Sequence, residues 1–454
     1  QIMLKTESQN FTALQKIGTL LNRNEPHTEN SVRSKLFIIC FVTFVASFDF
    51  TIFVFLSDSL SITFFAESGD EFSQQLKLVS LVAIGFIARP FGALLLGRYA
   101  DIKGRKPVLH IGLFLLFLTS IVAACLPTYS QVGVTASILL VIVRLIQGAA
   151  FANQLGLGWV YVAESLPRSR LATCIGMVCG SSALGVIFCA LMITYLNFVF
   201  SDAQLVAFAW RIPFVISGLM AFIGYLLVHK LSETTLFMKH KSDSIEPIEL
   251  SSFTYDLKRF NAYFLTFFLT LIYSSSMILL LLLLPKFINS QVSIDEFTLR
   301  ILSAFGMIGL ALGMLFYGWL ADKINLGRVL MVGSILLCLN AVLLYYYLSH
   351  GHGTYLVPIF TMVGFSNGII SLCPMIFLQL FPTQKRLMCT NVIFNVITVF
   401  TGVILPFSLL YTTEIISFAP AMYLIFIGVC AFFMGFYVYQ TPQLVKYQQL
   451  SASE

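Results

Sequence analysis

Long apolar stretches alternate with short polar ones along nearly the whole chain, and twelve such stretches can be distinguished. A helix rises about 1.5 Å per residue, so about 20 apolar residues cross the hydrocarbon core of a bilayer. The pattern therefore predicts an all-α membrane protein with twelve transmembrane helices. The expected spans are 35–58, 76–98, 107–127, 134–163, 171–198, 209–230, 260–284, 299–321, 329–348, 354–381, 388–411 and 419–440.

The composition indicates that lipid is the main solvent of this chain. Of its 454 residues, 58% are hydrophobic and 11% are charged, whereas soluble domains have about 45–50% apolar and about 25% charged residues. The net charge of +6 fits basic cytoplasmic loops better than nucleic-acid binding. The nine cysteines fall in apolar runs without metal-ligand spacing, so we expect no metal site, no disulfide framework and no cofactor.

The polar segments divide the spans into two groups of six. The longest interior polar segment is 231–259, which we expect to link an N-terminal half (35–230) to a C-terminal half (260–440). The remaining segments, 1–34 and 441–454, are also expected in the cytoplasm, because that orientation places most Lys and Arg residues inside. A cleaved signal peptide is not expected, since the first residues are polar.

Two charged motifs recur at corresponding places in the two halves. "GRYADIKGRK" (97–106) follows the second span, and "GWLADKINLGR" (318–328) follows the eighth. "ESLPRSR" (164–170) ends the fourth span, and "QLFPTQKR" (379–386) ends the tenth. Such internal repeats are typical of secondary transporters. We expect the first motif to form a hinge outside the lipid.

These motifs resemble those of major facilitator superfamily transporters. Matches to the metabolite:proton symporter branch are "SFDF" (47–50), "GFIARPFG" (85–92), "RLIQGAAFANQLGLGWVYVAESLP" (144–167), "FAWRIPF" (208–214) and "LFPTQKR" (380–386). That branch includes transporters of proline and betaine, shikimate, α-ketoglutarate and citrate. The resemblance implies two pseudo-symmetric six-helix halves that expose a central site alternately to each side of the membrane.

The resemblance also implies a function. We expect proton-coupled import of a small organic acid or zwitterionic metabolite, up to a citrate-like polycarboxylate or citrate-based siderophore, with the proton gradient as the driving force. The expected location is the bacterial inner membrane, and the expected state is a monomer without nucleic-acid partners. No pairing of a nucleophile with a base, metal spacing or phosphate loop is present, so we do not expect an enzyme.

Two acidic positions of the branch are neutral in this chain. The first span of the branch usually reads "EWYDF", whereas Ala46, Ser47 and Phe48 precede Asp49 here. Gln154 stands where the fourth span usually carries a glutamate. Export or uncoupled exchange of the same substrates is therefore an alternative, and a transport-inactive membrane sensor is another.

Two charged side chains are expected deep in the membrane, where a charge is costly and usually serves function. Asp49 lies about 14 residues into the first span, and Arg144 lies about ten residues into the fourth. We expect Asp49 to take up the coupling proton and Arg144 to bind a substrate carboxylate. A nearby cation favours the ionised carboxylate, so Asp49 would accept a proton when Arg144 is drawn away. The alternative is a structural ion pair between the two helices.

Further polar residues are candidates for the substrate site. Arg89 precedes Pro90, which bends the second span, and it is expected either to bind the anionic substrate or to brace the bend through backbone carbonyls. Neutral groups that complete the site, or bridge helices instead, are Asn153, Gln154, Tyr273, Asn367 and Asn395.

A cytoplasmic gate is expected from the repeated charged motifs, and the family resemblance implies that Asp101 latches it. The residues assigned to this gate are Asp101, Arg105, Glu164, Arg168, Arg170, Asp322 and Arg328. In the C-terminal copy the aspartate and arginine are farther apart, and Gln379 replaces Glu164. We therefore expect a stronger latch in the N-terminal half than in the C-terminal half.

Overall fold

The computed structural model describes residues 29–65, 83–243, 257–292, 294–350, 355–416 and 418–441, and the regular structure in these ranges is entirely helical. The elements of the first half are α2 (Glu29–Phe55), α3 (Ser57–Phe64), α5 (Arg89–Lys103), α6 (Arg105–Cys125), α7 (Tyr129–Val132), α8 (Val134–Ser165), η1 (Arg168–Arg170), α9 (Leu171–Val199), α10 (Asp202–Gln204), η2 (Leu205–Ala209) and α11 (Arg211–Val228). They are followed by α12 (Thr235–Asp243), α13 (Leu257–Ile278), η3 (Leu279–Leu283), α14 (Leu284–Gln291), α15 (Glu296–Lys323), α16 (Leu326–Ser349), α17 (Leu356–Asn367), η4 (Gly368–Ser371), α18 (Leu372–Phe377), α19 (Arg386–Ile415) and α20 (Ala419–Gln440).

Eleven helices of the described ranges are long and apolar enough to cross a membrane. They match every expected span except the second, whose start at 76–82 lies outside the described residues. Residues 83–87 are helical, and the N–H of Ala88 donates to the C=O of Ile84 at 3.2 Å, so this helix continues into α5. The prediction of an all-α membrane protein is confirmed.

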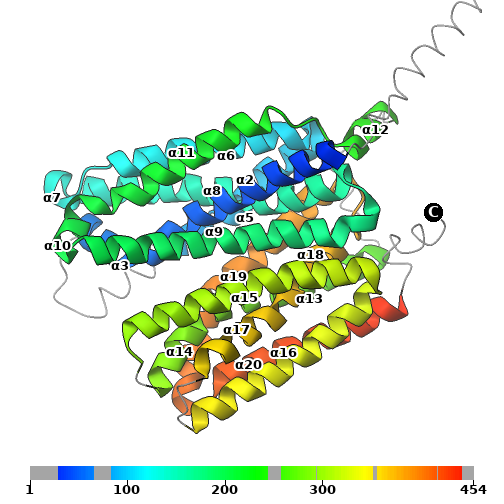
Figure 1. The fold of residues 1–454 in the computed structure, drawn as a ribbon. Coiled ribbons are helices and arrows are strands. Elements are labelled where there is room, and N and C mark those ends of the chain that lie inside the picture. Colours follow the sequence, from blue (N-terminus) through cyan, green and yellow to red (C-terminus); the bar gives the residue numbers. More distant parts are fainter. Residues whose placement is uncertain are drawn as a thin grey trace, which may run out of the picture.

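Two helical bundles lie side by side, one built from α2 to α11 and the other from α13 to α20 (Figure 1). They meet along two seams, where α9 packs on α15 and α5 packs on α19. Helix α8 also contacts α19. Polar side chains on α5, α8 and α19 can therefore bond from one half to the other.

The motif at 97–106 extends the helices beyond the expected ends of the second and third spans. It is helical on both sides of Gly104, which alone separates α5 from α6. Gly104 has a φ of 116°, a conformation that glycine adopts without steric cost. The carboxylate of Glu233 then caps α6 by accepting hydrogen bonds from the N–H groups of Arg105 at 2.9 Å and Lys106 at 3.1 Å. The charged motif is thus two abutting helix ends.

The tenth span is interrupted in its middle. Helix α17 ends at Asn367, a 3₁₀ turn covers Gly368–Ser371, and α18 follows. A 3₁₀ stretch inside a helix often marks a hinge, because its hydrogen-bond geometry is poorer. The structure thus places the break beside a candidate substrate residue.

Candidate functional site

Asp49 lies fully buried on α2, inside the N-terminal half. Its carboxylate accepts hydrogen bonds from Ser217 Oγ at 2.6 Å, from Gln147 Nε2 at 2.5 Å and from Ser120 Oγ. These donors belong to α11, α8 and α6. Neutral donors therefore satisfy the carboxylate, and it ties four helices of one half together.

Arg144 on α8 has its guanidinium against aromatic rings. Its Cζ lies 4.1 Å from the ring centre of Phe53 and 4.6 Å from that of Phe50. The residue is 1% exposed, and none of its guanidinium nitrogens has a hydrogen-bond partner among the described residues. The structural ion pair with Asp49 is therefore not formed here. A buried cation without an acceptor is costly, so this site is suited to an anionic ligand.

Arg89 lies near Arg144 and reaches the opposite half. Its Nε donates to Asn395 Oδ1 on α19 at 2.9 Å. Its Cζ lies 4.8 Å from the ring centre of Phe151 and 5.4 Å from that of Phe50. The expected bracing through backbone carbonyls is not seen in the described part of the chain; the contact is instead a side-chain bond between the halves.

Two of the candidate asparagines bridge helices. Asn153 Nδ2 donates to the C=O of Gly92 at 2.8 Å, and Asn153 Oδ1 accepts from Asn391 at 3.0 Å. Asn395 Nδ2 donates to the C=O of Ala152 at 3.1 Å. In this state these groups hold α5, α8 and α19 together, which is the helix-bridging interpretation.

Other candidates carry buried polar atoms that lack partners within the described ranges. They include the hydroxyl of Tyr273 and both side-chain polar atoms of Gln154. The Tyr273 ring packs 5.5 Å from the ring of Phe394 and 5.5 Å from that of Trp159. Asn367 Nδ2 donates to the C=O of Ser276 on α13 at 3.3 Å, while Asn367 Oδ1 has no hydrogen-bond partner among the described residues. These atoms remain available to a ligand or to another conformation.

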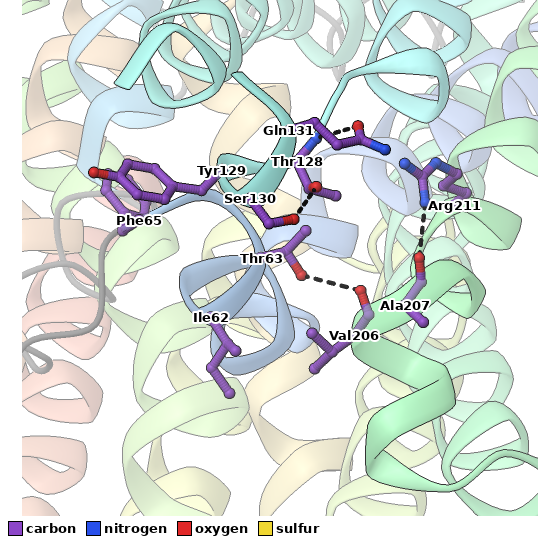
Figure 2. Close-up of a pocket in the computed structure, with 10 residues that line it drawn as sticks. All are labelled: Ile62, Thr63, Phe65, Thr128, Tyr129, Ser130, Gln131, Val206, Ala207 and Arg211. Atoms are coloured by element: carbon purple, nitrogen blue, oxygen red, sulfur yellow. Dashed lines mark hydrogen bonds between the residues drawn. The ribbon is translucent and has the colours of Figure 1, made fainter. Parts of the chain in front are cut away.

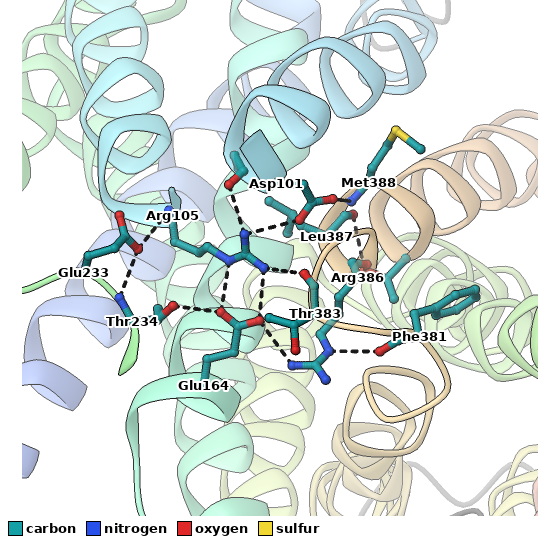
Figure 3. Close-up of polar contacts among 12 residues, drawn as sticks. Asp101, Arg105, Glu164, Glu233, Thr234, Phe381, Thr383, Arg386, Leu387 and Met388 are labelled. Carbon is teal, nitrogen blue, oxygen red and sulfur yellow. Dashed lines mark hydrogen bonds and ion pairs between the residues drawn. The ribbon is translucent and has the colours of Figure 1, made fainter. Parts of the chain in front are cut away.

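Arg105 is the centre of a polar network at one end of the molecule, where α5 meets α6 and α18 precedes α19 (Figure 3). Its guanidinium donates to Glu164 at 2.9 and 3.1 Å and to the C=O of Thr383 at 2.7 Å. Asp101 Oδ1 lies 3.4 Å from Arg105 Nη1, and Arg386 Nη1 donates to Glu164 Oε1 at 3.1 Å. We call these five residues the basic-end network. It joins the two halves, because Thr383 and Arg386 belong to the second.

Asp101 and its counterpart Asp322 each cap a helix of the other half. Asp101 accepts from the N–H of Met388 at 2.9 Å, in the first turn of α19. Asp322 accepts from the N–H groups of Ala172 at 2.9 Å and Thr173 at 2.8 Å, in the first turn of α9. A negative charge is favourable at a helix N-terminus. Each cap therefore joins the two halves.

The two copies of the charged motif differ in their ion pairs, whereas the aspartate of each copy caps a helix in the same way. Arg328 donates to Tyr439 Oη at 3.1 Å and is not bonded to Asp322. Gln379 has no hydrogen-bond partner for its side chain among the described residues. The C-terminal copy therefore has a complete cap without the charge network that surrounds Asp101.

Two arginines assigned to the gate lie apart from the centre of the network. Arg168 and Arg170 form the exposed turn η1, and Arg170 acts electrostatically on Asp322. Arg386, which is not among the residues expected to form the gate, is the arginine of the second half that pairs with Glu164. Its signal was its position as the last residue of the repeated motif at 379–386.

A cavity of about 650 Å³ opens beside α3, α7 and η2 (Figure 2). Its lining residues are Ile62, Thr63, Phe65, Thr128, Tyr129, Ser130, Gln131, Val206, Ala207 and Arg211. Two donors that line the cavity already bond to backbone carbonyls. Arg211 Nη1 donates to the C=O of Ala207 at 3.1 Å, and Thr63 Oγ1 donates to the C=O of Val206 at 3.4 Å. All lining residues belong to the first half, so we do not assign this cavity to transport.

Gly85 offers a test of how Arg144 is positioned. A Cβ at residue 85 would lie 2.5 to 2.7 Å from three atoms of the Arg144 guanidinium. Gly85→Ala is therefore expected to displace that flexible group, weakening ligand binding by about tenfold (1.4 kcal/mol) without a large loss of melting temperature. Ligand titration and thermal melting of the same sample measure both, and unchanged affinity would contradict this placement. Gly180→Ala on α9 is the control, since its added Cβ would meet only ordinary contacts of 3.5 Å or longer.

Solved structures share this fold. The proton:xylose symporter XylE bound to 6-bromo-6-deoxy-D-glucose superimposes with a TM-score of 0.74 at 14% identity, covering 91% of this chain and 96% of that one. FucP in its outward conformation gives a TM-score of 0.67 at 13% identity, covering 88% and 98%. At this identity the similarity concerns the fold alone.

Curated relatives are named as transporters. A candidate proline/betaine transporter of Staphylococcus aureus (strain COL) is 27% identical over 394 residues, covering 85% of this chain and 83% of the relative. The inner membrane metabolite transport protein YhjE of Escherichia coli (strain K12) is 23% identical, covering 87% and 91%. The alpha-ketoglutarate permease of the same strain is 32% identical over 188 residues, covering 41% and 43%.

The family model of the Major Facilitator Superfamily matches residues 39–269, which is just over half of the 454 residues. Together with the fold and the transporter relatives, this match indicates a membrane transporter of small molecules rather than an enzyme. The chain belongs to the Major Facilitator Superfamily.

Proposed function

We propose that this transporter imports a small organic acid or zwitterionic metabolite together with protons. The observation that carries the proposal is the buried guanidinium of Arg144, which has no hydrogen-bond partner among the described residues and interacts electrostatically with the buried carboxylate of Asp49. Arg144 would bind the carboxylate of the substrate, and Asp49 would bind the proton. The relatives named for proline/betaine, metabolite and α-ketoglutarate transport support this substrate class.

The proposed transport cycle is alternating access between the two halves. In the present conformation the basic-end network and the two aspartate caps join the halves at one end. We place that end in the cytoplasm, because positive residues favour the inner side of a membrane. The expected location is the bacterial inner membrane, and the expected state is a monomer. Release of substrate into the cell then requires the basic-end network to break.

Asp49→Asn tests the role of the proton. The variant keeps the size of the side chain but cannot be ionised, so proton-driven accumulation of substrate should be lost while exchange across the membrane persists. The measurement is uptake of radiolabelled succinate and glycine betaine into proteoliposomes, with and without an imposed pH gradient. Uptake by Asp49→Asn that is still driven by the pH gradient would contradict the proposal.

Export or uncoupled exchange is a second candidate. It is favoured by Gln154, which is neutral where related transporters carry a glutamate and whose side chain has no partner in the described structure. Proteoliposomes with pH gradients of either sign distinguish the two. A proton-coupled importer is expected to accumulate substrate only when the outside of the proteoliposome is the acidic side. Substrate accumulation by an uncoupled exchanger should respond to neither gradient.

A further inference from the structure

Two histidine rings from different helices pack against each other in the first half. His110 lies on the second turn of α6 and His229 directly follows α11, and their ring centres are 4.3 Å apart with the ring planes at 61°. The ring of Tyr225 packs edge to face on both, at 5.4 Å from His110 and 5.2 Å from His229. Because the two histidines are 119 residues apart in the chain, no spacing in the sequence signalled this pair.

The contacts of His110 fix which of its ring nitrogens carries the proton. Nδ1 lies 3.1 Å from the C=O of Lys106, and since a carbonyl oxygen can only accept, Nδ1 is the donor. In the neutral ring Nε2 then has a free lone pair, and this atom is buried without a hydrogen-bond partner among the described residues. A buried polar atom without a protein partner often marks a bound water molecule or ion.

This arrangement is the one that metal-binding histidines use. The second ring nitrogen of such a ligand almost always donates to a carboxylate, a backbone carbonyl or water, which fixes the tautomer and orients the ring. A zinc ion lies about 2.0–2.1 Å from the ligating nitrogen, hence about 3.2 Å from the ring centre. Two rings that bind one metal at about 90° have centres about 4.5 Å apart, which is close to the distance between His110 and His229.

We propose that His110 and His229 form a binding site for a late first-row divalent cation, with Zn²⁺ and Cu²⁺ as the metals of choice. Imidazole nitrogen suits these metals, whereas Mg²⁺ and Ca²⁺ prefer oxygen ligands. The described residues contain no group of three His, Cys, Asp or Glu side chains that could hold a metal. Since His229 is exposed, solvent supplies the remaining ligands.

Two protein ligands set a modest affinity. Half of the binding free energy of a four-ligand zinc site corresponds to a Kd on the order of 10 µM. The ammonium of Lys106, which donates to the C=O of His229 at 3.1 Å, adds a like charge nearby and lowers the affinity further. Both histidines belong to the first half, so a bound metal ties α6 to the end of α11, five residues along the chain from Arg105 of the basic-end network.

Zinc titration of the purified full chain without a polyhistidine tag tests the site. In a buffer that does not bind zinc, isothermal titration calorimetry is expected to detect this site in wild type. His229→Phe keeps an aromatic ring at an exposed position but removes one of two ligands, so binding should weaken at least about tenfold. His350→Phe is the matched control, because His350 is also exposed and packs on a tyrosine, at the end of α16. Its zinc affinity should equal that of wild type.

Bound Cu²⁺ gives a second readout that does not depend on the folding of a variant. Electron spin echo spectroscopy of wild type with one equivalent of Cu²⁺ is expected to show two coordinated imidazoles. A zinc affinity of His229→Phe within about twofold of wild type, or a copper spectrum with no more than one imidazole, overturns the proposal. In that case the two rings are packing partners, and a water molecule donates to Nε2 of His110.

Discussion

Glu164→Gln is expected to open the basic end of this transporter. Glu164 accepts hydrogen bonds from Arg105, Arg386 and Thr234, and it is the acidic partner of both arginines. Without its charge, the buried guanidinium of Arg105 and the partly buried guanidinium of Arg386 face each other from opposite halves. Removing one partner of a buried ion pair costs about 3–5 kcal/mol, which is more than about 100-fold in the ratio of closed to open forms.

Cys389 provides a native reporter of this opening. It lies on α19 directly after Met388, whose N–H binds Asp101, and it is 7% exposed. Labelling by a polar maleimide, mapped by mass spectrometry, should become at least about tenfold faster in Glu164→Gln. Cys125, which is exposed at the opposite end, serves as the internal reference. Asp202→Asn is the control, because Asp202 is exposed far from the network. An unchanged labelling rate at Cys389 would refute the gate.

Arg144→Gln is expected to abolish most substrate binding without unfolding the protein. Losing one partner of a buried charged pair in a complex costs about 2–5 kcal/mol, so affinity should fall at least about 30-fold. No hydrogen bond in the described structure depends on this guanidinium, and its buried charge is costly without a ligand. The melting temperature of the unliganded variant should therefore not fall.

Titration and thermal melting of wild type and Arg144→Gln test this second expectation. Arg144→Lys keeps the charge but loses the bidentate geometry, so an intermediate affinity is expected. If Arg144→Gln lowers the melting temperature strongly and leaves affinity unchanged, Arg144 serves the fold and the substrate site lies elsewhere.

The positions of the membrane helices followed from the sequence because the bilayer imposes one requirement on all of them. Each span must satisfy its own backbone and present about 20 apolar residues. The helix ends were harder to predict. Asp101 and Arg105 fell outside the expected spans because they are charged, whereas Glu164 and the cap of α19 allow both residues to be buried in helices.

The chemical groups were easier to predict than their partners. Asp49 and Arg144 stood out because charge is rare in an apolar run. The donors that hold Asp49 lie 71, 98 and 168 residues away, and serine or glutamine in a span carries no comparable signal. The separation of Asp49 from Arg144 depends on these long-range bonds, so the sequence left the ion pair open.

Thermal stabilisation of purified protein by a panel of ligands tests whether Arg144 binds the substrate. The panel comprises dicarboxylates, monocarboxylates, citrate and zwitterions, each applied to wild type and to Arg144→Gln. A ligand at 100 times its Kd stabilises the folded state by about 2.7 kcal/mol. At least one organic acid or zwitterion is expected to raise the melting temperature of wild type and to leave that of Arg144→Gln unchanged. A panel in which no organic acid or zwitterion shifts the melting curve of wild type would contradict a substrate site at Arg144.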